Sequence, residues 1–411
     1  MGSIVLRDYQ VNLSTRAAEL LRMRGLVLLI MQVRTGKTLT ALNTCDILKA
    51  KKVLFVTKKK VISSIESDYM NMGYAYSLTV TNYDMLHHFS SGYDVVIVDE
   101  FHSFGKYPIP SLRTKRLKEI CIGAMVIMLS GTPSPESYSQ FFNALLVSER
   151  GPWITYKNFY SWAKYYVNVR LKYVYNRQIN DYSHAKKDKV LGDIDPYVIR
   201  FTQEEAGFTT VALDHVVIIP TPEVVLNAIR LLSRDKIFNT SCGYTVLADT
   251  AVKLMIKVHQ LSSGTVKTEE GEYIAFCDFK ARFIQREFNG KKIAIFYKYI
   301  SERTHLEKIF NERIVDTTEE FNSTDHNKVY ISQIQSGREG IDLSSADCLV
   351  MYNIDFSALS YWQARERMQS KDRAKNSPVY WIMSTHGIEK KIYDVVQLKK
   401  DFTLSHFKKI L

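Results

Sequence analysis

The chain has 411 residues, which is too long for one ordinary hydrophobic core and predicts two or three domains. Hydrophobic residues make up 46% and charged residues 24%, a balance that excludes a wholly disordered chain. The formal net charge of +12 favours a polyanionic partner, although a soluble protein that is simply basic would carry the same surplus.

The first part of the chain predicts a parallel α/β sheet. Short runs rich in Val, Ile, Leu and Phe recur, with helical or loop segments between them. Such runs are apolar on both faces, which suits strands covered by helices on both sides. The runs are "LVLLIM" (26–31), "KVLFVT" (52–57), "SLTVTN" (77–82), "DVVIVDE" (94–100) and "AMVIMLSG" (124–131).

The loop after the first run has the composition of a phosphate-binding loop. "MQVRTGKT" follows "LVLLI" and precedes "LTALNTCDIL", whose apolar residues have helical spacing. In this arrangement backbone N–H groups and the helix N-terminus form an anion site. We expect Lys37 to reach the β- and γ-phosphates, Thr38 to hold Mg²⁺, and Gly36 to allow close backbone approach. Met31 stands where such loops usually have their first glycine, and a chance match at a helix start is the alternative.

Two adjacent carboxylates end a later run. "VVIVDEFH" places Asp99 and Glu100 after apolar residues, where a pair of acids is costly without a purpose. In a nucleotide hydrolase Asp99 would hold the Mg²⁺ shell through water, and Glu100 would polarise the attacking water. A strand-end turn with solvated acids is the alternative. The next run ends in "MLSGTP" (128–133), which contains the small hydroxylated residues Ser130 and Thr132.

The middle of the chain, from about 150 to 290, breaks this pattern. "YKNFYSWAKYYVNVRLKYVYNRQ" (156–178) mixes aromatic with basic residues, which suits contacts with single-stranded or branched nucleic acid. For residues 152–167 we favour ordinary helical packing around an aromatic core. For residues 168–190, which partly alternate, we expect a protruding hairpin arm or wedge. Helices are expected around 222–237 and 250–260.

The last part repeats the sheet pattern. Its apolar runs are "KIAIFY" (292–297), "KVYISQ" (328–333), "DCLVMYN" (347–353) and "PVYWIM" (378–383). The C-terminal segment "KKIYDVVQLKKDFTLSHFKKIL" is basic and amphipathic, and we expect a helix that closes the second sheet rather than a separate binding tail.

Cysteine usage and hydropathy indicate the cell compartment in which the protein is expected. The five cysteines are scattered and never form a CxxC pair, which indicates a reducing, cytoplasmic setting without zinc or disulfides. The apolar run "GLVLLIMQV" is too short to span a bilayer, so no membrane partner is expected.

The motifs and their order resemble superfamily 2 helicases, and within them the Swi/Snf-type DNA translocases, especially compact phage-like members. Segments that link and follow the two motor lobes, such as "PYVIRFTQEEAGF" (196–208), "KLMIKVHQLSSGTV" (253–266) and "KARFIQREFNGKKIAIFY" (280–297), also resemble that branch. The motif series is "LRDYQ" (6–10), "VRTGKT" (33–38), "VLFVTKKK" (53–60), "TVTNYDML" (79–86), "VDEFH" (98–102), "LSGTP" (129–133), "GREGIDLSSA" (337–346) and "QARERMQSKDR" (363–373).

The resemblance covers nearly the whole chain and implies an α/β fold of two RecA-like parallel-sheet lobes with helical or hairpin insertions. Lobe 1 is expected at 1–150, a basic aromatic insertion and linker at 151–215, and lobe 2 with a helical lead-in at 216–411. Many motors of this superfamily lack the first loop glycine, so Met31 is compatible with a working site.

The resemblance also implies roles for individual residues. Gln10, helped by Arg7, would recognise adenine, and Arg367 would act as an arginine finger beside Gln363. The implied catalytic residues are Lys37, Asp99, Glu100, Gln363 and Arg367. The implied nucleotide-binding residues are Arg7, Gln10, Arg34, Thr35, Gly36, Lys37, Thr38, Gly340 and Asp342. The residues that would couple hydrolysis to lobe movement are His102, Ser130 and Thr132. The implied DNA-backbone contacts are Thr57, Lys58, Thr81 and Asn82. The implied Mg²⁺ ligands are Thr38 and, through water, Asp99.

One position departs from the family pattern. A second arginine usually follows the first by three residues, and here that position is Ser370. Lys371 and Arg373 lie close by, and Arg373 is the better substitute because a guanidinium engages phosphate oxygens with two donors. His102 fits a DEAH-like box, although a lone histidine at a strand end is also often structural.

The predicted function is therefore an ATP- and Mg²⁺-dependent DNA translocase or helicase on duplex, forked or branched DNA, in replication, recombination or repair. Its location would be the cytoplasm, or the host cytoplasm if it is phage-encoded. Two alternatives stay open. One is an RNA helicase, since contacts to a 2′-hydroxyl cannot be read from sequence. The other is a nucleotide-gated DNA-binding scaffold with weak hydrolysis, which Ser370 motivates.

Overall fold

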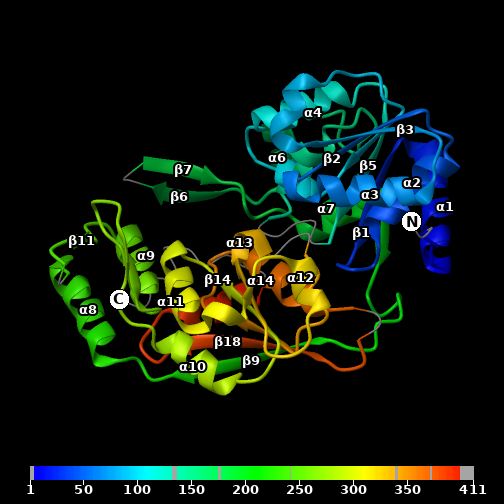
Figure 1. Cartoon of the computed structure of the whole chain (residues 1–411). Coiled ribbons are helices and arrows are strands. Elements are labelled where there is room, and N and C mark those ends of the chain that lie inside the picture. Colours follow the sequence, from blue (N-terminus) through cyan, green and yellow to red (C-terminus); the bar gives the residue numbers. More distant parts are fainter. Residues whose placement is uncertain are drawn as a thin grey trace. The chain divides into compact units, whose positions relative to one another are not determined.

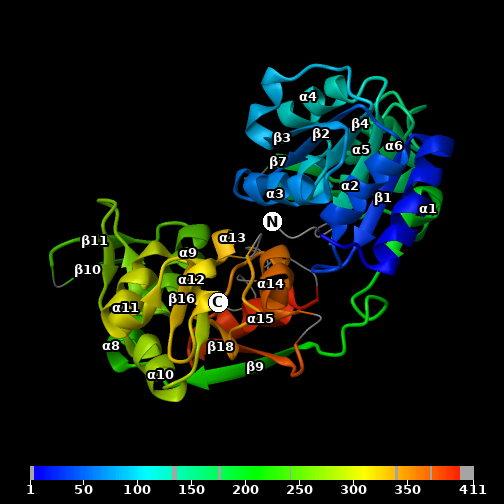
Figure 2. The same ribbon diagram turned by 45° about the vertical axis from the view of Figure 1, so that its right-hand side comes forward.

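The computed structural model describes residues 4–131, 137–174, 177–240, 242–337, 341–370 and 373–398. The chain forms two compact units, Met1–Gly207 and Phe208–Leu411. Each unit is built on a six-stranded parallel sheet, and helices lie on both faces of each sheet (Figures 1 and 2). The predicted fold of two RecA-like α/β lobes is confirmed. Within the described ranges, the helices are too short or too polar to span a bilayer.

The first unit contains a sheet with the strand order β3-β2-β4-β5-β1-β8. Its strands are β1 (Leu26–Met31), β2 (Lys52–Thr57), β3 (Ser77–Asn82), β4 (Val95–Val98), β5 (Met125–Ser130) and β8 (Val198–Phe201). Its α-helices are α1 (Asp8–Arg24), α2 (Lys37–Ile47), α3 (Ile62–Met72), α4 (Leu112–Ile120), α5 (Gln140–Leu145), α6 (Phe159–Tyr166) and α7 (Lys187–Ile194). Short 3-10 helices are η1 (Lys59–Val61), η2 (Tyr83–His88), η3 (Phe101–Phe104) and η4 (Asp195–Tyr197).

The register of this sheet gathers the predicted motifs at one edge. Ile30 of β1 pairs with Ser130 of β5, and Val98 of β4 pairs with Met128, which also lies on β5. Because all of these strands are parallel, their carboxyl ends meet at one edge of the sheet, where ligands bind in open α/β folds. The loop after β1, the acids after β4 and Gly131 after β5 therefore emerge together.

Residues 151–207, most of the predicted insertion and linker (151–215), group with the first unit. Trp153 and Trp162 are almost fully buried and pack on Phe142 of α5, with ring centroids 6.4 and 5.1 Å apart. Strand β8 pairs in parallel with β1 at the sheet edge. The expected packing role of residues 152–167 is what the structure contains, because these aromatic rings complete one core of the unit.

Residues 168–190 contain the expected hairpin. Strands β6 (Arg170–Val174) and β7 (Arg177–Asp181) pair antiparallel, with Arg170 opposite Asp181 and Lys172 opposite Ile179. The hairpin extends from the body of the first unit (Figure 1), and Leu171 and Ile179 are 63% and 46% exposed. Residues 175 and 176, between the two strands, lie outside the described residues.

The second unit repeats the architecture with the strand order β15-β16-β14-β17-β18-β9. Its sheet strands are β9 (Ala212–Ile219), β14 (Ile293–Tyr297), β15 (Ile314–Val315), β16 (Val329–Gln333), β17 (Cys348–Met351) and β18 (Ser377–Ser384). Two small antiparallel pairs are β10 (Ile237–Asn239) with β11 (Thr245–Leu247) and β12 (Thr265–Lys267) with β13 (Tyr273–Ala275). The helices are α8 (Glu223–Asp235), α9 (Ala251–Leu261), α10 (Phe279–Glu287), α11 (Ile300–Phe310), α12 (Thr318–Ser323), α13 (Ile334–Gly337), α14 (Ala358–Arg365) and α15 (Glu389–Val396), with 3-10 helices η5 (Asn311–Arg313) and η6 (Glu366–Met368).

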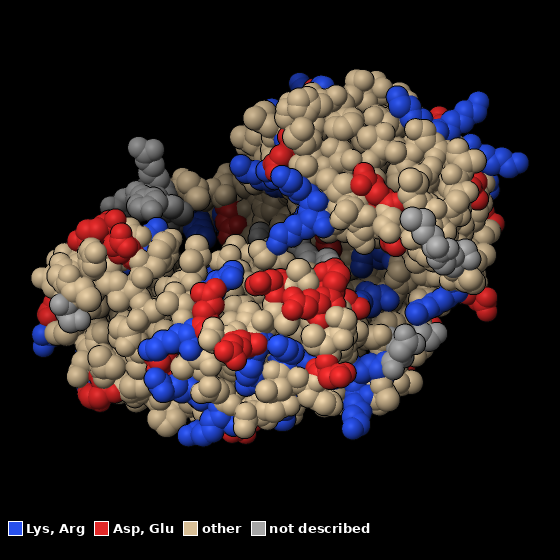
Figure 3. All heavy atoms as spheres, viewed as in Figure 1, with Lys and Arg blue, Asp and Glu red and all other residues tan. Residues whose placement is uncertain are grey.

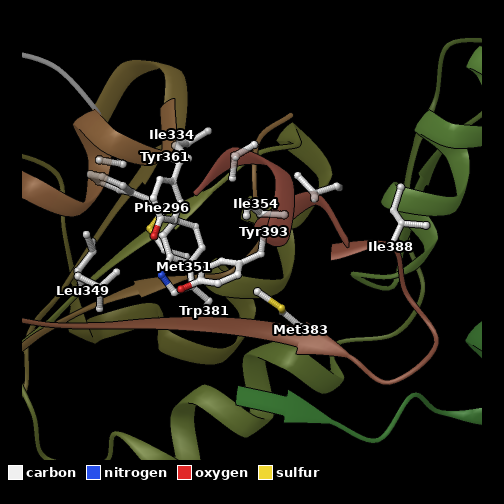
Figure 4. Packing of buried hydrophobic residues seen from close by; sticks show 14 of the residues in the cluster. Phe296, Ile334, Leu349, Met351, Ile354, Tyr361, Trp381, Met383, Ile388 and Tyr393 are labelled. Atoms are coloured by element: carbon white, nitrogen blue, oxygen red, sulfur yellow. The ribbon is translucent and has the colours of Figure 1, made fainter. Parts of the chain in front are cut away.

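Alternation along the strands separates two cores in the second unit. Ala294 and Phe296 of β14 face one buried cluster, while Ile293 and Ile295 face the other. Figure 4 shows part of the first cluster, in which Trp381 of β18 stacks on the ring of Tyr361 with centroids 4.9 Å apart. Helices α8 and α9 occupy the ranges expected for the helical lead-in. Helix α15 lies in the segment expected to form a C-terminal helix and ends at Val396, and the part of that segment from residue 399 lies outside the described residues.

Candidate active site

The loop between β1 and α2 contains two residues in the left-handed backbone conformation and ends at the N-terminus of α2. Arg34 and Gly36 have positive φ angles of 66° and 83°, and Gly36 caps the N-terminus of α2. The Lys37 ammonium donates to the carbonyl of Met31 at 3.0 Å. The side chain of Thr35 is buried and donates to the carbonyl of Gln32 at 2.7 Å, so it stabilises the turn itself. The loop thus presents backbone N–H groups and one lysine at a helix N-terminus, as the sequence predicts.

The structure brings Gln10 to this loop. A Cβ atom built on Gly36 would lie only 2.0 Å from Nε2 of Gln10, so a side chain at position 36 would collide with the amide. Gln10 is 4% exposed, and its Oε1 accepts from the backbone N–H of Arg7 at 2.9 Å. The Arg7 side chain is exposed and donates to the Tyr9 hydroxyl at 3.3 Å. Gln10 and Arg7 therefore lie at the start of α1, beside the predicted phosphate loop.

The acidic pair lies in a polar, largely enclosed setting. Oδ2 of Asp99 accepts from the Thr57 hydroxyl at 2.9 Å, and Oδ1 accepts from the N–H of Glu100 at 3.0 Å. Burial, and then the charge of Glu100, raise the pKa of Asp99 to about 6, while the Thr57 hydrogen bond and the Lys37 charge act in the opposite direction. A bound cation would relieve the burial and the repulsion from Glu100 that raise the pKa of Asp99.

Thr57 was predicted to contact the DNA backbone. In the structure its side chain is fully buried and donates to Asp99. Thr81, also predicted to contact DNA, is 4% exposed. Asn82 accepts from the N–H of Asp84 at 3.0 Å and so caps η2. Of the predicted DNA contacts, Lys58 keeps a half-buried position on the loop after β2, next to the exposed Lys59.

His102 and Ser130, the predicted coupling residues, lie in one series of contacts with Glu100. The backbone of Glu100 has a φ of 45°, an uncommon conformation for a residue with a side chain. Its Oε2 lies 3.2 Å from Nδ1 of His102, and the same nitrogen lies 3.5 Å from Oγ of Ser130. The series joins the end of β4 to the end of β5. Thr132, the third predicted coupling residue, lies outside the described residues.

Gly131 brings the end of β5 to the phosphate loop. A Cβ atom built on this glycine would lie 3.6 Å from Nζ of Lys37 and 3.5 Å from the carbonyl oxygen of Met31. A side chain at position 131 would therefore contact Lys37 of the predicted phosphate loop. Thr38, the predicted Mg²⁺ ligand, is half-buried in the first turn of α2.

Sequence reasoning missed Gln203. This residue follows β8, and its Nε2 donates to the carbonyl of Val33 in the phosphate loop at 3.0 Å. Its backbone N–H donates to Oε1 of Gln32 at 2.6 Å, and the N–H of Gln32 donates to the carbonyl of Phe201 at 3.0 Å. The segment after β8, which leads out of the first unit, therefore hydrogen-bonds to the predicted phosphate loop and holds it in place. The available signal was the short run "YVIRF" (197–201), of which residues 198–201 form the strand β8.

In the second unit, helix α14 and η6 carry the predicted finger. Arg367 is half-buried, and its Nε donates to the backbone carbonyl of Gln363 at 3.2 Å. The backbone carbonyl of Arg367 accepts from the N–H of Leu343 at 3.3 Å, next to the exposed Asp342. Asp342 accepts from the N–H of Ser344 at 2.9 Å. The structure thus joins Gln363, Arg367 and Asp342 in one region, while Gly340 lies outside the described residues.

Arg373, the predicted substitute for the second finger, donates to backbone carbonyls in the structure. Its Nη1 donates to the carbonyls of Ser344 and Ala346 at 2.7 and 2.9 Å, and Nε donates to that of Lys375 at 3.1 Å. Desolvation by the surrounding chain lowers the pKa of this guanidinium from its usual value. Its donors therefore hold the loop that follows Asp342. Lys371, the other candidate, lies outside the described residues.

Asp214 anchors the finger helix to the sheet. Its carboxylate accepts from the hydroxyl of Tyr361 at 2.5 Å and from Nε1 of Trp381 at 3.0 Å. Arg365 lies 3.3 Å from the same carboxylate and donates to the carbonyl of Ala212 at 2.9 Å. Strand β9, which begins shortly after the linking segment, thereby fixes α14 and the residues that follow it.

Comparison with known proteins matches residues 253–371 to the helicase conserved C-terminal domain. Over 103 residues the chain is 29% identical to Helicase swr1 of Aspergillus fumigatus and 30% identical to Helicase SWR1 of Candida glabrata. These matches cover 23% of this chain but only 6% and 7% of the relatives' own length. Among solved structures, the SWI2/SNF2 ATPase core of Sulfolobus solfataricus in complex with double-stranded DNA is 15% identical, with a TM-score of 0.44 over 100% of this chain and 93% of that chain.

Residues 253–371 are thus similar to the helicase conserved C-terminal domain. This match and the SWR1 relatives agree with the predicted resemblance to superfamily 2 helicases of the Swi/Snf type. The likeness to compact phage members stays a prediction.

Proposed function

We propose that the chain is an ATP-dependent DNA translocase or helicase that uses Mg²⁺. The observation that carries this proposal is the gathering of Lys37, Asp99 and Glu100 at one sheet edge, with Glu100 in contact with His102 and, through it, Ser130. An ATPase needs a phosphate site, a metal-binding acid and a base, and a motor needs in addition a connection from the base to a moving element.

The residues fit the substrate and metal. The N-terminus of α2 and Lys37 would hold the β- and γ-phosphates, and Thr38 and Asp99 would hold Mg²⁺. The described residues contain no cluster of three or more His, Cys, Asp or Glu side chains able to hold a metal by themselves. This agrees with a Mg²⁺ site completed by water and substrate phosphates. When bound, the metal supplies positive charge that neutralises the developing charge on the phosphate oxygens.

The division of labour follows from the contacts. Asp99 is fixed by Thr57 and by the N–H of Glu100, so its carboxylate is held in place as a metal ligand. Glu100 lies beside His102, which orients it as the base that takes a proton from the attacking water. Arg367 would supply the positive charge that stabilises the transition state.

DNA is the proposed track. Lys58, Lys59 and Lys60 follow β2 at the same sheet edge as the acidic pair, and the exposed Arg170 and Lys172 lie on the β6–β7 hairpin. On the face that Figure 3 shows, basic side chains of the second unit lie among acidic ones. The proposal therefore places the main phosphate contacts on the first unit, with the hairpin as an arm or wedge at duplex or branched DNA. Replication, recombination and repair are the processes that offer such DNA.

The test compares ATP turnover and strand separation on single-stranded, duplex, forked and four-way DNA, and on matched RNA. We expect DNA to stimulate turnover, with EDTA abolishing it. Lys37→Ala serves as the inactive variant, and Lys51→Ala, an exposed lysine outside the site, serves as its matched control. Turnover that no nucleic acid changes would refute the motor, and stimulation by RNA alone would favour an RNA helicase.

One observation favours a second candidate, a DNA-binding scaffold with weak hydrolysis. Ser370 stands at the usual position of the second finger, and Arg373 is engaged by backbone carbonyls. Nucleotide-dependent DNA binding combined with turnover that stays near the Lys37→Ala level on every DNA would select the scaffold.

A further inference from the structure

A pocket in the first unit lies apart from every residue of the proposed active site. It has a volume of about 360 Å³, within the range of ligand sites, and lies between the 108–110 loop, α4, α5 and the start of α6. Its lining includes Ile109, Leu146 and Phe159 on the apolar side. None of the predicted nucleotide or DNA contacts lines it.

The walls of this pocket are held in place. Phe142 and Phe159, 0% and 2% exposed, meet edge to face with ring centroids 5.7 Å apart and form part of the unit's core. Nδ2 of Asn143 donates to the carbonyl of Lys106 at 2.6 Å and so fastens the loop that carries Ile109. Ile109 itself is 61% exposed. The pocket is therefore built on rigid elements and offers an accessible apolar surface.

Three lysines surround this apolar surface. Lys115 and Lys118 lie one turn apart on α4, Lys157 lies just before α6, and all three are exposed. They form no ion pair with a described residue, whereas the neighbouring Arg113 and Arg116 pair with acids on the same unit. The rim is therefore a concentration of uncompensated positive charge around an apolar centre.

We propose that this pocket binds an acidic peptide segment of a partner protein, which inserts one large apolar side chain between carboxylates that face the lysines. Charge complementarity selects the acidic flanks, and the apolar floor selects the anchor. Single-stranded nucleic acid fits less well, because Tyr160 is the one exposed ring among the described lining residues and the other rings are enclosed. A second copy of this chain, with its net charge of +12, is disfavoured by repulsion.

The experiment measures fluorescence anisotropy of a labelled peptide, Gly-Asp-Asp-Phe-Asp-Asp-Gly, titrated with the full chain at low salt. We expect saturable binding that weakens as salt rises. Replacing the peptide's Phe by Ser or its Asp residues by Asn should each weaken binding at least about tenfold. In the protein, Lys118→Glu and Ile109→Asp should weaken it by about the same factor. Both positions are exposed, and an unchanged melting temperature confirms folding.

The matched control is Lys164→Glu, an exposed lysine of α6 that does not line the pocket. The proposal is overturned if this variant weakens binding as much as Lys118→Glu, because the contact would then be unspecific. It is also overturned if the peptide does not bind, or if an oligothymidine competitor displaces it equally well from wild type and from Lys164→Glu, since the pocket would then be a nucleic-acid site. These readouts need no ATP turnover, so the proposal stands or falls independently of the motor.

Discussion

Replacing Arg373 with alanine removes a guanidinium that donates to the carbonyls of Ser344, Ala346 and Lys375 at 2.7, 2.9 and 3.1 Å. The first two belong to the loop that follows Asp342, so this loop loses charge-assisted donors. A hydrogen bond from a charged donor contributes roughly 1.5–3 kcal/mol when buried, and Arg373 is only half-buried. We therefore expect the two short bonds together to contribute about 2 kcal/mol to the local stability of the loop.

The assay is amide hydrogen exchange of the loop, measured together with steady-state ATP turnover at saturating DNA. A local loss of about 2 kcal/mol should speed exchange of the Leu343 and Ala346 amides about 30-fold. Turnover should fall by less than about tenfold, because the guanidinium does not act on the nucleotide. The control is Arg230→Ala on α8, whose exposed side chain pairs with Glu223 at 2.7 Å and which should leave the loop unchanged.

The opposite pattern would refute this reasoning. If Arg373→Ala left exchange unchanged but lowered kcat by the roughly 10³–10⁵ typical of an arginine finger, then Arg373 would act on the nucleotide after all. Its hydrogen bonds to the loop would then have to break during each cycle.

Four further predictions concern the proposed ATPase. Lys37→Ala should abolish turnover while DNA binding, measured by anisotropy, survives; turnover within a few-fold of wild type would exclude the loop as the site. Glu100→Gln should stop hydrolysis and keep nucleotide binding, whereas Asp99→Asn should weaken Mg²⁺-dependent binding; equal losses of affinity in calorimetry would contradict this division. Arg367→Ala should lower kcat by roughly 10³–10⁵ with little change in nucleotide affinity, and a loss confined to affinity would count against a finger. Gln203→Ala should raise the nucleotide dissociation constant about fivefold, because it removes one hydrogen bond to the loop. Gln203→Glu, whose side chain cannot donate this bond, should have the same effect. Wild-type affinity in both variants would show that the loop does not need this hydrogen bond.

The sheets were predictable because their central strands are apolar on both faces. Every run proposed as a strand coincides with one, from β1 through β18, since a buried parallel strand needs no partner-specific signal. The edge strands β8 and β9 were not predicted. Each is interrupted by polar residues, Arg200 in β8 and the Asp214–His215 pair in β9, so neither has a continuous apolar run. Their place in the sheets follows from tertiary pairing alone.

Among the site residues, too, some were predictable from the strand pattern and others depend on tertiary contacts. Lys37, Asp99 and Glu100 could be found because each follows a buried strand at a position that the register of the sheet fixes. The contact of Thr57 could not be predicted from the sequence. Whether its hydroxyl faces solvent or Asp99 depends on the neighbouring strand. Arg373 shows the same limit, since a cation near the expected finger position is equally able to bind carbonyls of a loop that precedes it.

The segment that connects the two units also forms hydrogen bonds within each of them. Four residues before the first unit ends, Gln203 holds the phosphate loop through the carbonyl of Val33. Shortly after the second unit begins, Asp214 holds Tyr361 and Arg365 of the helix that leads to the proposed finger. One stretch of chain therefore hydrogen-bonds to the phosphate loop within one unit and to the finger helix within the other. The Gln203 contact is a local hydrogen bond, whereas Tyr361 belongs to a core cluster of the second unit. We therefore expect a displacement of this stretch to act on the loop directly and on the helix through that core.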